Sequence, residues 1–188
     1  MADRQVGGFT LIELLIVIAI ILILIAIALP NFLEAQIRAK VARVLADHRS
    51  IVTAVESYQI DHKDYMPYDR WGSHGQPRYF NALTTPIRYF TNADTVSDPF
   101  FDVEIDQYQG RDRYGYYSDG VKGGRPSQAW IDIAARLRFS RLPGFTGVRY
   151  CITSSGPDTV LQIDGGPPIF YSPTNGTKSI GDILRFGP

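Results

Sequence analysis

Cysteine and net charge are what this 188-residue chain has least of. Its single cysteine, Cys151, excludes an intramolecular disulfide and is expected to be a buried strand residue rather than a reactive or intermolecular thiol. Its 19 basic and 19 acidic side chains leave no net charge, which argues against a nucleic-acid-binding surface. The histidines have no metal-ligand spacing and are expected at the surface or at helix ends: His48, His62 and His74.

Catalytic signatures are missing as well. The sequence contains no G-x-S-x-G, no H-E-x-x-H and no phosphate-binding loop. We therefore expect a structural protein that is not an enzyme and requires no cofactor. A membrane-tethered binding module that stacks tyrosine-rich loops against sugars is the alternative from a different functional class.

A long apolar run near the N-terminus is the clearest feature that is present. From Phe9 to Leu29, only Thr10 and Glu13 are polar. At about 1.5 Å per residue, a helix of this length crosses the roughly 30 Å hydrocarbon core of a bilayer. A carboxylate in such a helix costs on the order of a few kcal/mol, so Glu13 is expected to have a partner.

Small residues precede this run instead of following it. A secretory signal peptide has its small-residue cleavage site after the apolar core, whereas Gly7 and Gly8 come before it. Cleavage at this position would keep the hydrophobic helix in the mature chain. The apolar pattern alone leaves open an uncleaved single-span anchor with an incidental Gly-Gly pair.

The stretch GGFTLIELLIVIAIILILIAIALPNF resembles the class III leader and N-terminal helix of type IV pilins and type II secretion pseudopilins. The matching features are Gly8 before Phe9, Glu13 four residues later, the aliphatic run, and Pro30 before Asn31-Phe32. The resemblance implies cleavage after Gly8 by the prepilin peptidase and N-methylation of the new terminus at Phe9.

In a growing filament, the carboxylate of Glu13 can meet the new Phe9 ammonium group of a neighbouring subunit. An unpaired charge is penalised in a low dielectric, so such a pair favours the correct axial register. Glu13 is therefore predicted to be an assembly residue that stays unpaired until a neighbour docks.

The resemblance also implies where the chain lies and what it binds. It implies a single-pass inner-membrane protein with a periplasmic C-terminal domain, in a homo-oligomeric helical filament that is periplasmic or extracellular. Further expected partners are the prepilin peptidase, the inner-membrane assembly platform and minor pilins or pseudopilins. The positive-inside rule points to the opposite orientation, because the leader MADRQVGG has Arg4 as its one basic residue while Arg38, Lys40 and Arg43 follow the run. The cleavage motif decides the orientation here.

Pro30 is expected to kink or loosen the helix, because it lacks the N–H that would bond to the carbonyl of Ala26. Beyond it, apolar residues recur at alternating spacings of four and three, which indicates one helical stripe that packs on a sheet of the same subunit. A coiled-coil partner is the weaker option, because the register lasts about three heptads. The stripe consists of Ile37, Val41, Val44, His48, Ile51, Val55 and Tyr58, and His48 interrupts its apolar character.

After Asp61, short stretches are separated by Pro, Gly and Asp. Strands are expected at residues 148–155, 159–164, 167–172 and 181–187, with a helix near Ser127–Phe139 and a turn at 172–176. The predicted fold is α+β: a long N-terminal helix, half membrane-spanning and half amphipathic, packed on a small antiparallel β-sheet as in pilins. The expected divisions are a cleaved leader (1–8), a transmembrane and assembly helix (9–29), the amphipathic half (30–61) and a periplasmic β-rich domain (62–188).

Four later stretches occur in an order similar to that in the major, G-type pseudopilins: LTTPIRYF, DPF, YGYYSDG and ITSSGPD. In that family the final loop holds calcium where many pilins have a disulfide. The resemblance implies Asp158 and Asp164 as calcium ligands, since calcium prefers hard oxygens. The acidic, Gly-rich loop is shortened here, and the alternative is that both aspartates only make turns.

The implied function is that of a structural subunit of a helical filament assembled from the inner membrane. A type II secretion pseudopilin that drives protein export is preferred, because of the motif order and the lack of a cysteine pair. The alternative is a major or minor type IV pilin, which serves adhesion, twitching motility or DNA uptake.

Overall fold

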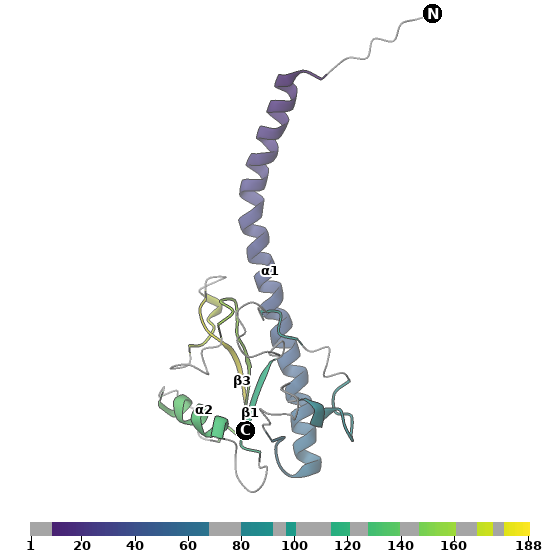
Figure 1. Cartoon of the computed structure of the whole chain (residues 1–188), viewed down its shortest axis with the longest axis vertical. Coiled ribbons are helices and arrows are strands. Elements are labelled where there is room, and N and C mark those ends of the chain that lie inside the picture. Colours follow the sequence, from purple (N-terminus) through teal and green to yellow (C-terminus); the bar gives the residue numbers. More distant parts are fainter. Residues whose placement is uncertain are drawn as a thin grey trace, which may run out of the picture. The chain divides into compact units, whose positions relative to one another are not determined.

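The computed structural model describes residues 9–67, 80–91, 97–100, 114–120, 128–139, 147–160, 169–174 and 179–188. Its elements are helix α1 (Leu11–His62), 3-10 helix η1 (Asn81–Leu83), strand β1 (Gly115–Ser118), helix α2 (Gln128–Phe139), strand β2 (Tyr150–Ser154) and strand β3 (Ile183–Gly187), as Figure 1 shows. The expected α+β class, with a long N-terminal helix and a small antiparallel sheet, is confirmed. The chain divides into unit 1, Met1–Arg38, and unit 2, Ala39–Pro188, which are described separately.

Unit 1 contains the first part of α1. All side chains from Phe9 to Leu33 are exposed in the single chain. Within the described residues, α1 is the one helix long and apolar enough to cross a membrane. An apolar surface of this extent is not stable in water, so lipid or other protein must cover it. Pro30 lies inside α1, and the kink expected there stays a prediction.

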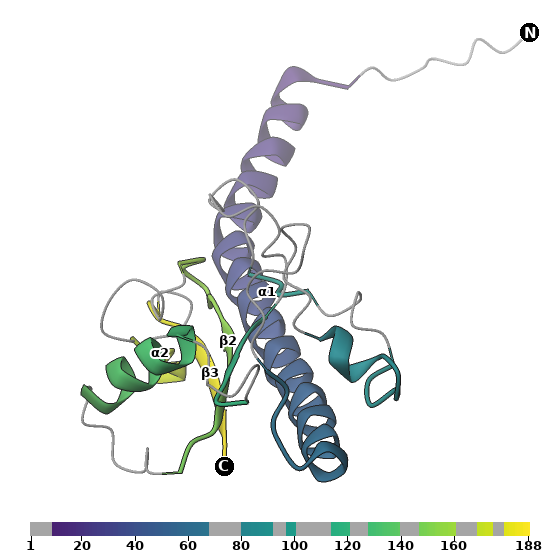
Figure 2. The ribbon, with the colours of Figure 1, turned by 60° about the horizontal axis from the view of Figure 1, so that its bottom comes forward.

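Unit 2 is built on an antiparallel sheet in which β2 lies between β1 and β3. Tyr117, Cys151 and Phe186 align across the three strands and pack in one cluster with Trp130 and Ile133 of α2. Because successive strand residues point to opposite faces, the neighbouring row faces the other way. That face is covered by the C-terminal part of α1, so the sheet lies between two helices (Figure 2).

The part of α1 in unit 2 packs through the stripe that the sequence predicts. Its buried residues are Val41, Val44, His48, Ile51, Ala54 and Val55, and the stripe's last member, Tyr58, is half-buried. Hydrogen bonds from tyrosines of the sheet region reach the same helix. The Tyr150 hydroxyl donates to Glu56 Oε1 at 2.8 Å, and the Tyr114 hydroxyl donates to Asp47 Oδ2 at 2.8 Å. The expected packing of helix on sheet is confirmed.

Most other elements of unit 2 match the expectations. β2, β3 and α2 lie where two strands and the helix were predicted. Cys151 is fully buried in β2, and this burial raises the pKa of its thiol. The strand expected at 167–172 is wrong in its described part, where Phe170 forms only an isolated bridge with Asp182. Its two prolines cannot donate ladder hydrogen bonds. The strand expected at 159–164 lies mostly outside the described residues, and the turn expected at 172–176 is described only as far as Thr174, whose hydroxyl lies 2.7 Å from that of Ser172.

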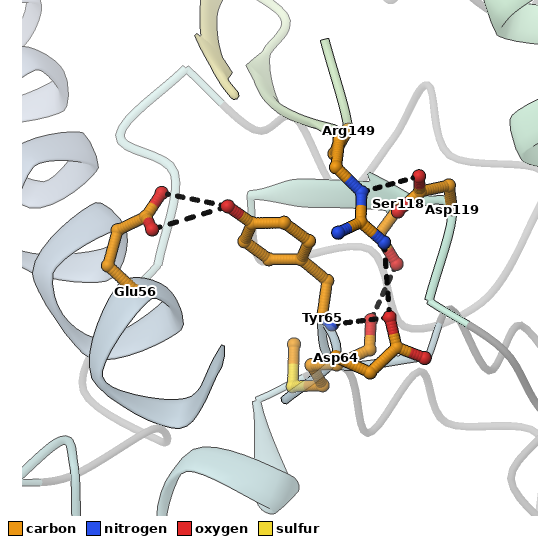
Figure 3. Close-up of polar contacts among 7 residues, drawn as sticks. Glu56, Asp64, Tyr65, Ser118, Asp119 and Arg149 are labelled. Carbon is orange, nitrogen blue, oxygen red and sulfur yellow. Dashed lines mark hydrogen bonds and ion pairs between the residues drawn. The ribbon is translucent and has the colours of Figure 1, made fainter. Parts of the chain in front are cut away.

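A group of polar side chains fixes the chain where it leaves α1 (Figure 3). The Tyr65 hydroxyl donates to Glu56 Oε2 at 3.3 Å. Arg149 donates to Asp119 Oδ2 at 2.8 Å and to Asp64 Oδ1 at 3.2 Å, and its guanidinium lies 4.9 Å from the centre of the Tyr65 ring. Because these ion pairs are partly exposed, each contributes modest stability. Together they set the direction in which the chain crosses from the helix to the sheet.

His48 is the clearest error among the sequence expectations for this unit. It was expected at the surface or at a helix end, but only 1% of it is exposed. The ring of Tyr114 contacts it edge-on, with 5.0 Å between the ring centroids. Neither ring nitrogen has a hydrogen-bond partner among the described residues. Burial, assisted by the positive charge of Arg185, lowers the pKa of His48 to about 4. His62 is exposed in the last turn of α1, as expected.

We predict that His48 makes unit 2 acid-sensitive. Unfolded His48 binds a proton below its ordinary pKa of 6.5, whereas the folded side chain binds one only near 4. The folded state therefore has its full stability above pH 6.5. Its free energy of unfolding decreases as the pH falls toward 4, because only the unfolded state binds the proton. His48→Leu should remove up to about 3 kcal/mol of acid destabilisation at pH 4. The measurement is urea unfolding of the full chain in detergent micelles at neutral and acid pH, followed by tryptophan fluorescence.

His62→Leu is the matched control, because His62 is exposed and should leave the pH dependence unchanged. The buried Asp98 has a raised pKa because of its own desolvation, and it opposes the His48 effect in both proteins. The comparison between variants therefore isolates His48. Equal acid sensitivity in wild type and His48→Leu would contradict the prediction.

Candidate assembly site at the start of α1

The first turn of α1 holds a reciprocal pair of polar residues in an otherwise apolar segment. Glu13 Oε2 accepts hydrogen bonds from the backbone N–H of Thr10 at 2.9 Å and from the Thr10 hydroxyl at 2.7 Å. In return, Thr10 Oγ1 accepts from the backbone N–H of Glu13 at 3.3 Å. This is a capping box, with Thr10 as the N-cap residue and Glu13 three positions later.

The capping box adds a local partner that the sequence analysis did not include. Glu13 was predicted to stay without a partner charge until a neighbour docks, and in the single chain its carboxylate accepts two hydrogen bonds from the uncharged Thr10. The sequence signal was present, because a threonine followed three residues later by glutamate before an apolar run is typical of a helix start. The interpretation of Glu13 as a residue waiting for an intermolecular charge ignored this local partner.

This geometry lowers the cost of a carboxylate at a helix start. In hydrocarbon, each unsatisfied backbone polar group costs several kcal/mol, and the box satisfies the N–H groups of Thr10 and Glu13. The positive end of the helix dipole also favours an anion at this position. Among the described residues, Glu13 Oε1 accepts no hydrogen bond. A carboxylate oxygen has two lone pairs, so Oε1 can still accept a hydrogen bond from a cation.

The other predicted processing residues lie directly before the box. Phe9 is 77% exposed, and Gly8 lies outside the described residues. Their predicted roles in cleavage and N-methylation, and the assembly role of Glu13, stay predictions.

Comparison with known proteins points to this same segment. Residues 3–29 match the prokaryotic N-terminal methylation motif. The chain is 53% identical over 62 residues to the type IV wide pilus major component PilA4 of Thermus thermophilus, covering 33% of this chain and 47% of the relative. It is 37% identical over 65 residues to the type II secretion system core protein G of Pseudomonas aeruginosa, covering 35% of this chain and 46% of the relative.

The chain is thus similar, over its N-terminal methylation motif and over about a third of its length, to type IV pilins and to a type II secretion system protein. A third relative, the type IV major pilin protein PilA of Myxococcus xanthus, is 44% identical over 61 residues, which are 32% of this chain and 28% of the relative. The chain thus spans less than half the length of these pilin and pseudopilin relatives. No solved structure matches it significantly.

The second predicted site, for calcium, is described only in part. Asp158 Oδ1 accepts from the backbone N–H of Val160 at 3.3 Å, and Oδ2 accepts from that of Gly181 at 3.1 Å. These contacts match the alternative in which Asp158 organises turns. Asp164 lies outside the described residues. No group of three or more His, Cys, Asp or Glu side chains in the described part of the chain is placed to hold a metal. The calcium site stays a prediction.

We predict that Thr10→Val weakens the start of α1 without changing its hydrophobic length. Valine has nearly the shape of threonine but cannot form the hydroxyl hydrogen bonds with Glu13. Loss of an N-cap side chain costs about 1 kcal/mol in water. Amide hydrogen exchange of residues 11–14 should become several-fold faster in detergent micelles, while residues 20–25 exchange as before. Thr10→Ser is the matched control and should preserve protection; equal protection in Thr10→Val would show that the box does not hold the turn.

Proposed function

We propose that this chain is a structural subunit of a helical filament assembled from the inner membrane. The observation that carries the proposal is the pilin-type segment, in which the capping box holds Glu13 at the start of a lipid-length helix. All known relatives named above are filament or secretion-system proteins rather than enzymes. A structural role needs only that this segment pack side by side with further copies.

The proposed assembly step gives Glu13 a second partner beside Thr10. Cleavage after Gly8 would create an ammonium group at Phe9, the residue directly before Thr10. The ammonium group of one subunit could then approach Glu13 of its neighbour, where Oε1 has no hydrogen bond within the described part of the chain. A buried pair of opposite charges is favoured over two separate buried charges, so correct register is selected.

Two machines of this class differ in what the filament does. The named type IV pilins among the relatives favour a pilus, whereas the match to a core protein G and the order of the C-terminal motifs favour a secretion pseudopilus. These matches each cover only about a third of this chain, and both classes are among them. We propose the pseudopilus, which would drive protein export, as the first candidate because the chain has no cysteine pair. The pilus is the second candidate.

The remaining parts of the proposal follow from the same class. The chain would be a single-pass inner-membrane protein with unit 2 in the periplasm, and the filament would be periplasmic or extracellular. The prepilin peptidase would process it. The assembly platform and minor pilins or pseudopilins would bind it.

We predict that Glu13→Ala and Glu13→Gln insert into the membrane but fail to assemble. Either change leaves the Phe9 ammonium group of the neighbour buried without a counter-charge, which costs roughly 3–5 kcal/mol. Glutamine can keep part of the capping box, so Thr10→Val and Glu13→Gln separate capping from charge. The readout is sheared or cross-linked filament from cells with equal subunit levels. Glu34→Gln is the matched control, because this exposed carboxylate pairs with Arg38 outside the apolar run. Wild-type assembly of Glu13→Ala would contradict the role of Glu13.

We predict separately that the mature chain begins at Phe9. Gly8 is the small residue that lets a peptidase approach the backbone closely. Replacing Gly8 with leucine should leave the full-length precursor in the membrane fraction, whereas Gly8→Ala should be cleaved more slowly than wild type. N-terminal sequencing and intact mass of membrane-extracted protein give the result. An intact Met1 in the wild-type protein would overturn the processing step.

A further inference from the structure

Unit 2 exposes three large aliphatic side chains in the described parts of its β2–β3 connection. Val160 is 50% exposed, Ile169 41% and Ile180 59%. We call these three residues the aliphatic patch. Single exposed aliphatic residues are ordinary, but several in one connection indicate a contact surface.

Hydrogen bonds hold the three parts of this connection together. Asp158 accepts from the backbone N–H groups of both Val160 and Gly181, at 3.3 and 3.1 Å. The N–H of Asp182 donates to the carbonyl of Ile169 at 2.8 Å. Gly181 has a φ of +122°, and a Cβ there would lie 2.7 Å from the Ile169 carbonyl oxygen, so glycine is required for this close approach. The patch is therefore displayed by a fixed backbone.

The patch lies at the end of unit 2 where the chain enters from unit 1. β2 begins at Tyr150, which bonds to Glu56 late in α1. After β2 ends, the N–H of Ser155 donates to Asp98 Oδ2 at 3.1 Å. Asp98 also accepts from Phe100, whose ring lies 5.7 Å from Lys40 Nζ.

Ser155, where the β2–β3 connection begins, is thus near Lys40, the second residue of unit 2. This is the end of the sheet opposite the chain's C-terminus (Figure 1). Of the other exposed aliphatic residues, Ile87 is 48% exposed and lies near the far end of α1, where Tyr89 donates to Asp61 at 2.8 Å. This residue provides an internal comparison.

A short tether keeps this end of unit 2 near the membrane. The exposed apolar run of α1 extends to Leu33, and unit 2 begins at Ala39. Even a fully extended chain of this length reaches only about 20 Å. The headgroup layer adds about 5–8 Å on each side of the hydrocarbon core. The Lys40 end of unit 2 is therefore confined close to the lipid headgroups, whatever its orientation.

We propose that the aliphatic patch, together with Lys40, contacts the surface of the bilayer in the subunit before assembly. Aliphatic side chains insert at the boundary between headgroups and acyl chains, and a nearby lysine adds attraction to anionic lipid. The tether supplies a high effective concentration, so a patch of this size can bind without strong intrinsic affinity. The inference rests on the membrane anchoring in the proposed function and adds a second, peripheral lipid contact to it.

The test uses the full chain in vesicles of phosphatidylcholine and phosphatidylglycerol that contain headgroup-quencher lipid. Ile180→Cys and, as the matched control, Ile87→Cys carry an environment-sensitive dye; the native Cys151 is buried and is not labelled in the folded chain. Quenching should be several-fold greater at position 180 than at position 87. Adding Val160→Ser and Ile169→Ser should reduce quenching at 180 to the level of the control, with circular dichroism unchanged. Lys40→Gln should remove any increase in quenching at position 180 that phosphatidylglycerol causes.

The outcomes separate this inference from the function on which it rests. Flotation with the vesicles reports anchoring. If the chain does not float, the anchoring fails and the inference fails with it. If it floats but positions 180 and 87 are quenched equally, only the lipid contact is overturned. If the emission of the dye at position 180 shifts to the blue with rising protein concentration and is not quenched, the patch contacts a second copy of the chain. That result would also overturn the lipid contact.

Discussion

The structure depends on a lipid-length apolar helix that must be kept out of water and must still carry a carboxylate. Every side chain from Phe9 to Leu33 is exposed in the single chain, so this surface is stable only against lipid or other subunits. The capping box of Thr10 and Glu13 makes the carboxylate tolerable by giving it two local hydrogen bonds, and a third bond joins the Glu13 backbone N–H to the Thr10 hydroxyl oxygen. One polar pair thus supports both helix formation and the proposed register of the filament.

The same helix serves unit 2 in a different way. Beyond Arg38 its buried stripe packs on one face of the sheet, and α2 covers the other face. A three-stranded sheet has too little apolar area to be stable alone, so both faces need a cover. Tyrosines at the start of β1 and β2 bond to Asp47 and Glu56. These bonds join the sheet to the part of α1 that belongs to unit 2.

The sequence predicted those parts of the molecule in which local pattern and burial agree. The alternating apolar spacing around Val44 and Ile51 identified the buried face of α1, and short stretches between turn residues identified β2 and β3. β1 was not predicted, because Gly115, Ser118 and the following Asp-Gly are typical of turns. Its strand is stabilised by cross-strand pairing, for example Tyr117 with Cys151, and such non-local contacts are not visible in a single segment.

The sequence by itself determined the apolar helix, the position of Glu13, the processing motif and the α+β class, because each depends on residues adjacent in the chain. Only the tertiary structure decided that His48 is buried at the helix–sheet contact and that Asp158 ties Val160 to Gly181. Both depend on segments that are distant in sequence. Hydrophobic periodicity defines which face of an element is buried, but the partner that covers that face is selected by packing across the whole unit.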